Sequence, residues 1–299
     1  MSFPAPPFDH ELSEILNVQQ IHDDPDITHE EVTIPGPGGD VILSILRSKS
    51  STKDKNNPGL YLIHGGGMVM GNRFYLITAM FPFIKELGAV LVSVEYRLAP
   101  ENPAPAAVQD CYAGLQWTFE NAARLGIDAS KVIVTGGSAG GGLSAGVALL
   151  SRDRKAPPLF AQMLLYPMID DRCTSVSSQQ FPDEGIWTDK TNKAAWDHYL
   201  GAGVRGTDKV NIYDAPARAK DLSNLPPTFI EVGASEPFRD EDVAFAMKLW
   251  EHGIPTELHV WPGAWHAYDI LAPNSDIGRI STETRMRWIK RVLSAPKTS

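Results

Sequence analysis

The chain has 299 residues, of which 43% are hydrophobic and 21% are charged, as in an ordinary globular protein. At this length it could form one large α/β domain or two smaller domains. Its formal net charge of −9 argues against nucleic acid as a partner, because binding to phosphate groups requires a basic surface.

The N-terminal segment and the cysteines narrow the class of protein further. Residues 1–28 contain neither the basic nor the apolar region of a signal peptide, and no stretch reaches the roughly 18 apolar residues of a membrane-spanning helix. Cys111 and Cys173 are too few for a disulfide framework and lack metal-binding spacing. We therefore expect a cytoplasmic protein that does not insert into a membrane.

A short helix is compatible with residues 11–19, and an acidic stretch follows around His22. Three aspartates next to a histidine could indicate a metal site, but Pro25 and the absence of loop spacing favour a solvated surface. Residues 30–34 and 40–46 then alternate apolar and polar side chains around a turn rich in proline and glycine. That pattern predicts an antiparallel hairpin.

From there, strands and helices alternate along the chain. Strands are predicted at residues 59–63, 89–94, 131–135, 160–166, 228–232 and 256–261. Helices are predicted at residues 76–87, 106–125, 140–152, 241–252 and 280–292. Short apolar strands that alternate with helices favour a mostly parallel sheet covered on both faces, with the hairpin supplying antiparallel strands at one edge.

The first strand of this series ends in a run of small residues, His64-Gly65-Gly66-Gly67. Residues without side chains allow several backbone N–H groups to converge on one oxygen, and this motif forms the oxyanion hole of some acyl-transfer enzymes. We expect Gly66 and Gly67 to be oxyanion donors, with His64 and Gly65 supporting the loop.

The strand at 131–135 leads into a second glycine-rich turn. Gly136, Ser138 and Gly140 fit the G-x-S-x-G nucleophile elbow, in which a strained turn between a strand and a helix exposes the serine hydroxyl. Small residues are needed two positions before and after the serine so that the strand and the helix can approach each other. Ala139, the residue after the serine, would supply a third oxyanion donor.

The same turn has a second interpretation. Gly140, Gly142 and Ala145 fit the G-x-G-x-x-[GA] pattern of a dinucleotide-binding fold, and Asp170 lies roughly where a ribose-binding acid would be. In that fold the first glycine should end the strand, whereas Gly140 falls well past it. The choice depends on whether a base, an acid and an oxyanion hole exist elsewhere in the chain.

The alternation of strands and helices stops between residues 170 and 225, where no clear strand is found. This segment contains the aromatic residues Trp187, Trp196 and Tyr199. Thr188 or Asp189 could cap a helix that runs to Leu200. An insertion of this length in a compact α/β domain usually covers a site.

The base and the acid are expected at the carboxyl ends of the last two strands, because ligands bind at that edge of open α/β sheets. Of the eight histidines, His266 stands out because it follows the strand at 256–261 and a Pro-Gly turn. Glu236 follows the preceding strand, which gives the chain order Ser138, Glu236, His266 of a hydrolase. Asp240 is the competing acid, but its neighbours resemble the acidic first turn of the next helix.

Together these residues resemble a known family, the hormone-sensitive-lipase-like branch of the α/β-hydrolases, over roughly residues 60–268. The motifs that carry the resemblance are His64-Gly65-Gly66-Gly67, Tyr96-Arg97-Leu98-Ala99-Pro100-Glu101 with Pro103, Pro105 and Asp110, Gly136 to Gly141, Leu165-Tyr166-Pro167, and Glu236-Pro237-Phe238-Arg239-Asp240-Glu241. The chain departs from the family at Gly137, where many members have an acidic residue, and at Glu236, where aspartate is usual. The family's His-Gly-Phe is His266-Ala267-Tyr268 in this chain, which keeps the histidine.

The resemblance implies a single α/β-hydrolase domain over residues 1–299, with a central, mostly parallel eight-stranded sheet flanked by helices. It also implies a helical cap formed by about residues 1–28 and 175–220. The implied activity is hydrolysis of small-molecule carboxylic esters without a cofactor, and no metal-binding or nucleotide-binding motif points elsewhere. A homodimer is left open.

The sequence thus predicts a serine carboxylesterase that acts on short-acyl esters through Ser138, His266 and Glu236. A lactone or amide hydrolase would use the same residues and stays open. A non-catalytic binding protein of the same fold is the alternative from another class, and the presence of all three residues argues against it. Four side chains near the motifs either line an apolar pocket or belong to the core: Met68, Met70, Trp265 and Tyr268.

Overall fold

The computed structural model describes residues 19–51, 56–75 and 77–295. Within them, eight strands form one sheet in the order β1-β2-β4-β3-β5-β6-β7-β8. The strands are β1 (Ile27–Gly36), β2 (Gly39–Ser48), β3 (Asn57–Ile63), β4 (Val90–Glu95), β5 (Ile127–Gly137), β6 (Ala161–Leu165), β7 (Thr228–Gly233) and β8 (Thr256–Trp261).

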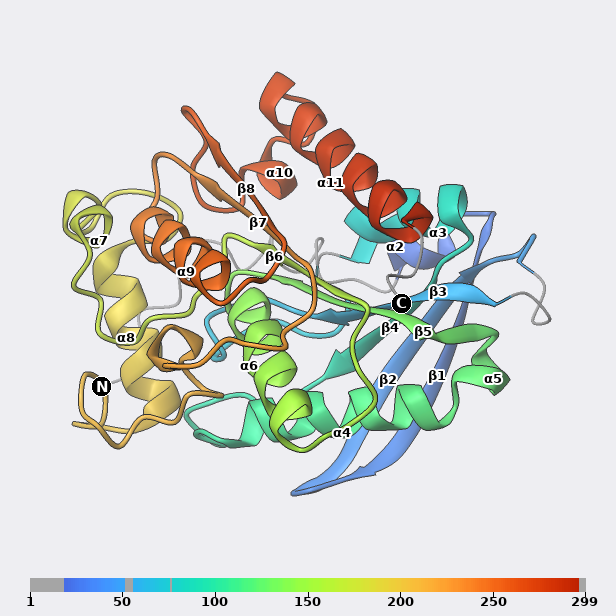
Figure 1. The fold of residues 1–299 in the computed structure, drawn as a ribbon, viewed down its shortest axis with the longest axis horizontal. Helices are drawn as coiled ribbons and strands as arrows, with labels where there is room; N and C mark the ends of the chain where they lie inside the picture. Colours follow the sequence, from blue (N-terminus) through green and yellow to red (C-terminus); the bar gives the residue numbers. More distant parts are fainter. Residues whose placement is uncertain (1–18, 52–55, 76, 296–299) are drawn as a thin grey trace.

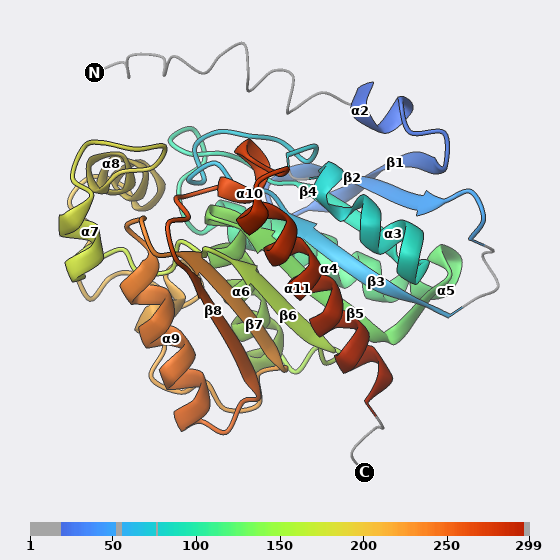
Figure 2. The same cartoon turned by 90° about the horizontal axis from the view of Figure 1, so that it is seen from above.

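Helices cover both faces of the sheet (Figures 1 and 2). The α-helices are α2 (Gln19–His22), α3 (Phe81–Leu87), α4 (Ala106–Glu120), α5 (Ala122–Leu125), α6 (Ala139–Asp153), α7 (Val176–Gln180), α8 (Asp189–Leu200), α9 (Arg239–Glu251), α10 (Tyr268–Leu271) and α11 (Asp276–Ser294), and the 3₁₀ helices are η1 (Ile77–Met80) and η2 (Pro216–Arg218). In Figure 1, α3 and α11 lie on one side of the sheet, whereas α4 and α6 lie on the other. Within the described part of the chain, no helix has both the length and the apolar character needed to cross a bilayer.

The predicted hairpin forms one edge of the sheet. β1 and β2 pair antiparallel from Ile27 opposite Ser48 to Gly36 opposite Gly39, and β2 also pairs antiparallel with β4. The other neighbouring strands are parallel. The structure therefore confirms the predicted α/β fold with a mostly parallel sheet and antiparallel strands at one edge.

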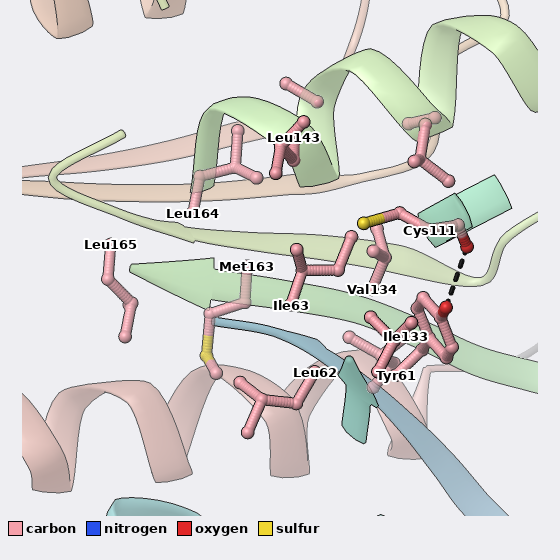
Figure 3. Close-up of a cluster of buried hydrophobic side chains, with 14 of the residues drawn as sticks. Tyr61, Leu62, Ile63, Cys111, Ile133, Val134, Leu143, Met163, Leu164 and Leu165 are labelled. Carbon is pink, nitrogen blue, oxygen red and sulfur yellow. Dashed lines mark hydrogen bonds between the residues drawn. The ribbon is translucent and has the colours of Figure 1, made fainter. Parts of the chain in front are cut away.

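The central strands are predominantly apolar, as expected for parallel strands with helices on both faces. All residues of β3 and β6 are buried. Figure 3 shows side chains of β3, β5 and β6 packed together with Leu143 of α6. The hydroxyl of Tyr61 donates a hydrogen bond to the carbonyl oxygen of Cys111 at 2.7 Å, so that this buried polar group is paired.

Two predicted helices differ from the structure for local reasons. Of the helix predicted at 76–87, residue 76 is not described, and the rest is η1 followed by α3. Pro82 lies in the first turn of α3, where its missing N–H has no intrahelical partner to lose, and this position favours a helix start. The helix predicted at 106–125 is divided into α4 and α5 at Asn121, whose Nδ2 donates to the carbonyl oxygen of Trp117 at 2.9 Å.

The segment between residues 170 and 225, here called the insertion, contains α7, α8 and η2 and no strand, as predicted. α8 begins after Thr188, whose hydroxyl oxygen accepts a hydrogen bond from the N–H of Thr191 at 3.2 Å. The N-terminal part of the predicted cap is described only from α2 onward. Residues 1–18, with nearly all of the helix predicted at 11–19, lie outside the described residues.

The register of the parallel strands brings the predicted motifs to one edge of the sheet. Ile63 at the end of β3 lies opposite Gly136 of β5, and Gly137 lies opposite Leu165 at the end of β6. Gly233 at the end of β7 lies opposite the last residue of β8. The glycine run, the elbow and the segments that carry the predicted acid and base therefore all leave the sheet at its carboxyl edge.

Candidate active site

Ser138 lies at the tip of the sharp turn between β5 and α6. Its φ of 57° and ψ of −124° are unusual for a residue with a side chain. Two backbone hydrogen bonds hold the turn: the N–H of Ser138 donates to Leu165 at 2.9 Å, and the N–H of Met168 donates to the Ser138 carbonyl at 3.0 Å. The strained backbone is thus fixed from β6 and from the loop that follows it.

The glycines around Ser138 are required by close backbone contacts. A Cβ atom at Gly136 would lie 2.5 Å from the carbonyl oxygen of Gly140, and one at Gly140 would lie 2.0 Å from the carbonyl oxygen of Ile63. α6 already begins at Ala139, so Gly140 lies inside the helix and does not end the strand. The dinucleotide-binding interpretation therefore does not fit, because this glycine packs on β3 and leaves no space there for a phosphate.

The structure brings Ser138, His266 and Glu236 into one row of hydrogen bonds. Nε2 of His266 lies 3.0 Å from Oγ of Ser138, and Nδ1 of His266 lies 2.5 Å from Oε2 of Glu236. The N–H of Gly233 donates to Oε1 of Glu236 at 2.8 Å, which fixes the second carboxylate oxygen. The exposed fractions of the three residues are 6%, 5% and 1%, so this row is nearly closed to solvent.

Asp240, the competing acid, lies in the first turn of α9 and serves another element. Its Oδ2 accepts a hydrogen bond from the N–H of Ser177 in α7 at 2.7 Å, and its Oδ1 accepts one from Arg239. Burial alone would raise the pKa of Asp240, but the hydrogen bonds from Arg239 and Ser177 lower it overall. This carboxylate therefore links α7 to α9 by a hydrogen bond. Within the described residues, it makes no hydrogen bond to His266.

Three aromatic rings surround the imidazole of His266. Tyr166 and Phe238 meet it edge-on, with ring centroids 4.9 Å and 5.1 Å away, and both rings are buried. Trp187 of the insertion lies 6.0 Å away at a tilt of 36°. These contacts restrict the orientation of the imidazole, which a catalytic base requires.

The glycine run after β3 forms a loop beside Ser138. Gly66 and Gly67 have φ values of 106° and 62°, which glycine adopts without strain, and a Cβ on Gly66 would lie 2.1 Å from the carbonyl oxygen of Met70. Within the described residues, the N–H groups of Gly66, Gly67 and Ala139 donate no hydrogen bond to the protein. Three donors are therefore available beside Ser138.

His64 supports this loop from below. It is fully buried, its Nδ1 lies 2.8 Å from the carbonyl oxygen of Gly65, and its ring stacks on Tyr96 at 4.0 Å. The hydroxyl of Tyr96 donates to the His64 carbonyl at 2.9 Å. Burial lowers the pKa of His64 to about 4, so the imidazole is neutral at physiological pH.

Sequence reasoning missed a buried charge cluster behind His266. Asp269, three residues after His266, accepts a hydrogen bond from the Tyr166 hydroxyl at 2.8 Å and pairs with Arg285 of α11 at 2.7 Å. Arg285 also bonds to Glu231 of β7 at 2.7 Å. Burial raises the pKa of Glu231 despite the opposing effect of Arg285. The cluster ties the His266 loop to α11, and no local motif marks it because its members are far apart in sequence.

The four predicted pocket residues occupy different places. Met68 is fully buried, and the hydroxyl of Tyr268 points to Glu231 at 3.4 Å, in the charge cluster. Trp265 is 41% exposed, and Met70 is half-buried in the oxyanion loop. Trp187, by contrast, lies against His266, although the sequence marked it only as one aromatic residue of the insertion.

Comparison with known proteins gives consistent matches. A model of the α/β-hydrolase fold family matches residues 60–270. The chain is 36% identical over 248 residues to carboxylesterase NlhH of Mycobacterium tuberculosis, which covers 80% of this chain and 75% of that protein. It is 31% identical over 257 residues to esterase LipI of the same organism, which covers 84% and 77%. Among solved structures, a bacterial heroin esterase has a TM-score of 0.90 at 33% identity, with 96% of this chain and 90% of that chain covered.

Proposed function

Because the chain belongs to the hormone-sensitive-lipase-like family of α/β-hydrolases and is a carboxylic ester hydrolase, we propose that Ser138, His266 and Glu236 are its catalytic residues. We also propose that short-acyl esters are its substrates. The support comes from the continuous row of hydrogen bonds from Glu236 through His266 to Ser138. In this order, a carboxylate orients a base and the base activates a nucleophile.

In the acylation step, Oγ of Ser138 attacks the ester carbonyl carbon while Nε2 of His266 takes the hydroxyl proton. Glu236 holds the imidazole through Nδ1 and stabilises its charged form. The carbonyl oxygen becomes an oxyanion that accepts hydrogen bonds from the N–H groups of Gly66, Gly67 and Ala139. His266 then gives the proton to the leaving alkoxide, and an acyl-serine remains.

Deacylation repeats these steps with water as the nucleophile. His266 removes a proton from water, hydroxide attacks the acyl carbon, and the same N–H groups bind the second oxyanion. The proton then returns from His266 to Oγ of Ser138, and the carboxylic acid leaves. No step requires a cofactor, because the protein supplies the nucleophile, the base and the oxyanion donors.

The preference for short acyl groups is supported by the closed surroundings of the catalytic row. Ser138 and His266 are nearly inaccessible, and Met68, next to Gly67 in the oxyanion loop, is fully buried. A small ester can enter a site that is this enclosed, whereas a long acyl chain would have to displace buried side chains.

Substitution of Ser138 by alanine tests the catalytic assignment. We expect Ser138→Ala to lower kcat for p-nitrophenyl acetate by on the order of 10⁶-fold and to abolish labelling by a serine-directed phosphonate. Ser144→Ala is the matched control. Ser144 is buried in α6, the helix that follows Ser138, and its hydroxyl donates to the Gly140 carbonyl at 2.7 Å. Turnover that survives Ser138→Ala would rule out this serine as the nucleophile.

A further inference from the structure

Trp187 touches both halves of the catalytic apparatus. A Cβ atom on Gly67 would lie 2.6 Å from Cη2 of Trp187, so the indole packs directly on the backbone of the oxyanion loop. The same ring lies 6.0 Å from the imidazole of His266, and only 9% of the residue is exposed. Trp187 therefore links the segment that binds the oxyanion to the residue that protonates the leaving group.

The indole is held in place by the insertion. Its Nε1–H donates to Oδ1 of Asn192 at 3.4 Å, and Nδ2 of Asn192 lies 3.3 Å from Sγ of Cys173. The next residue, Thr188, caps α8. These contacts hold the indole of Trp187 in one position. An incoming substrate group therefore cannot easily displace it.

The chemistry of the reaction defines which part of the substrate lies next to the indole of Trp187. At the tetrahedral carbon, the oxyanion must face the N–H groups of Gly66 and Gly67, and the leaving oxygen must lie within hydrogen-bond reach of Nε2 of His266. Trp187 contacts one of these donors and faces His266. It consequently borders the sector in which the alcohol part of the ester leaves the reacting carbon.

Two other aromatic neighbours of His266 occupy further sides of the imidazole. Tyr166 and Phe238 present their edges to the imidazole and are 1% and 0% exposed. The Tyr166 hydroxyl is bonded to Asp269 in the charge cluster, which fixes that ring. These two buried rings leave no room for an alcohol group on their sides of the imidazole, and Trp187 is the aromatic neighbour that also packs on the oxyanion loop.

We propose that Trp187 limits the size of the alcohol part of the substrate, so that the site accepts esters of small or flat alcohols and rejects branched ones. The inference rests on the proposed function, since it requires Ser138 and His266 to be the catalytic pair. Trp187 is then a specificity-determining residue that contacts substrate. Its effect falls on the alcohol part, whereas selection of the acyl part depends on other residues.

The test uses the purified full chain and two ester series followed by titration of released acid. In the alcohol series, the acid is acetate and the alcohol is ethanol, hexanol or menthol. In the acyl series, the alcohol is ethanol and the acid is acetate, hexanoate or cyclohexanecarboxylate. We expect Trp187→Ala to raise kcat/KM for menthyl acetate relative to ethyl acetate by at least about tenfold, with less than about threefold change of the corresponding ratio in the acyl series.

Two further variants keep the result interpretable. Ile186→Ala changes the neighbouring residue, which is 39% exposed, and should leave both ratios as in the unmodified chain. Trp187→Phe retains an aromatic ring and should shift the alcohol ratio in the same direction by less, even where Trp187→Ala folds poorly. An equal or larger change in the acyl series, or no change in a folded Trp187→Phe variant, would overturn the proposal. Failure of the unmodified chain to hydrolyse any ester would instead remove the proposed function on which it rests.

Discussion

The acid of the proposed triad is a residue whose two oxygens have separate partners. Oε2 of Glu236 faces His266, and Oε1 accepts the N–H of Gly233. The extra methylene of glutamate is accommodated in this way without loss of the contact to the imidazole. The carboxylate can therefore hold one tautomer of His266, with its proton on Nδ1 and its lone pair directed at Ser138.

Exchange of each candidate acid for its amide separates the two. Glu236→Gln removes the charge that stabilises the imidazolium and permits the wrong tautomer, so we expect kcat for p-nitrophenyl acetate to fall by about 10³- to 10⁴-fold. Asp240→Asn keeps an oxygen that can accept from Ser177 and should lower kcat by less than about tenfold. A larger loss in Asp240→Asn than in Glu236→Gln would transfer the role of acid to Asp240.

Gly140 gives a second prediction at the scale of one residue. In Gly140→Ala the new Cβ would lie 2.0 Å from the carbonyl oxygen of Ile63, so β3 and α6 must move apart. We expect the free energy of unfolding in urea to fall by about 1–3 kcal/mol. We also expect a lower kcat per folded molecule, because the oxyanion loop follows β3 and would move with it. Gly253→Ala is the control, since φ there is 74° but no atom lies within 4 Å of the new Cβ. It should lose stability through backbone strain and keep its kcat; unchanged kcat in Gly140→Ala would contradict the elbow geometry.

Among the elements, α8 is a helix whose start is capped by a single side chain, that of Thr188. Thr188→Ala removes the oxygen that accepts the N–H of Thr191, and we expect a cost of about 1 kcal/mol in the free energy of unfolding. Thr191→Val retains that N–H and removes only the hydroxyl, so it should cost less. Urea unfolding of both variants measures the difference, and equal costs would argue against the assigned cap.

Features that depend on residues close together in the sequence were predictable, whereas features that depend on contacts between distant segments were not. Ser138, the glycine run and Thr188 belong to short motifs whose spacing carries a physical reason, so their places followed from sequence. The break at Asn121 lies within a continuous helical pattern of the sequence, and propensity alone does not reveal it. The positions of Trp187 and Arg285 depend on packing between segments far apart in the chain, which periodicity does not report.

At the scale of the whole molecule, a buried acid makes stability depend on pH. Burial raises the pKa of Asp214 from the ordinary value of 3.8 to about 6, although the hydrogen bond from the Tyr199 hydroxyl at 2.6 Å opposes this. The carbonyl of Tyr199 also accepts the N–H of Ala104, so this pair lies where the insertion meets the main domain. Because the folded pKa is raised, the stability from protonated Asp214 is fully present below pH 3.8 and is lost as pH rises toward 6 and above.

Asp214→Asn should remove this dependence, because the amide stays neutral while its oxygen can still accept from Tyr199. We expect the free energy of unfolding of the variant, relative to that of the unmodified chain, to increase by up to about 3 kcal/mol between pH 4 and pH 7.5, so that the variant becomes relatively more stable. Urea unfolding at both pH values provides the measurement. A difference between the two proteins that is the same at both pH values would show that Asp214 does not titrate in this range.

The order of the strands has a consequence for how the protein is made. Ser138 follows β5, but Glu236 follows β7 and His266 follows β8, which is the last strand and lies at the edge of the sheet. A chain that leaves the ribosome from its N-terminus therefore carries the proposed nucleophile long before it carries the proposed base. We expect it to remain chemically inert until β8 docks on β7, so that recovery of ester hydrolysis during refolding reports the completion of the sheet rather than the first collapse of the chain.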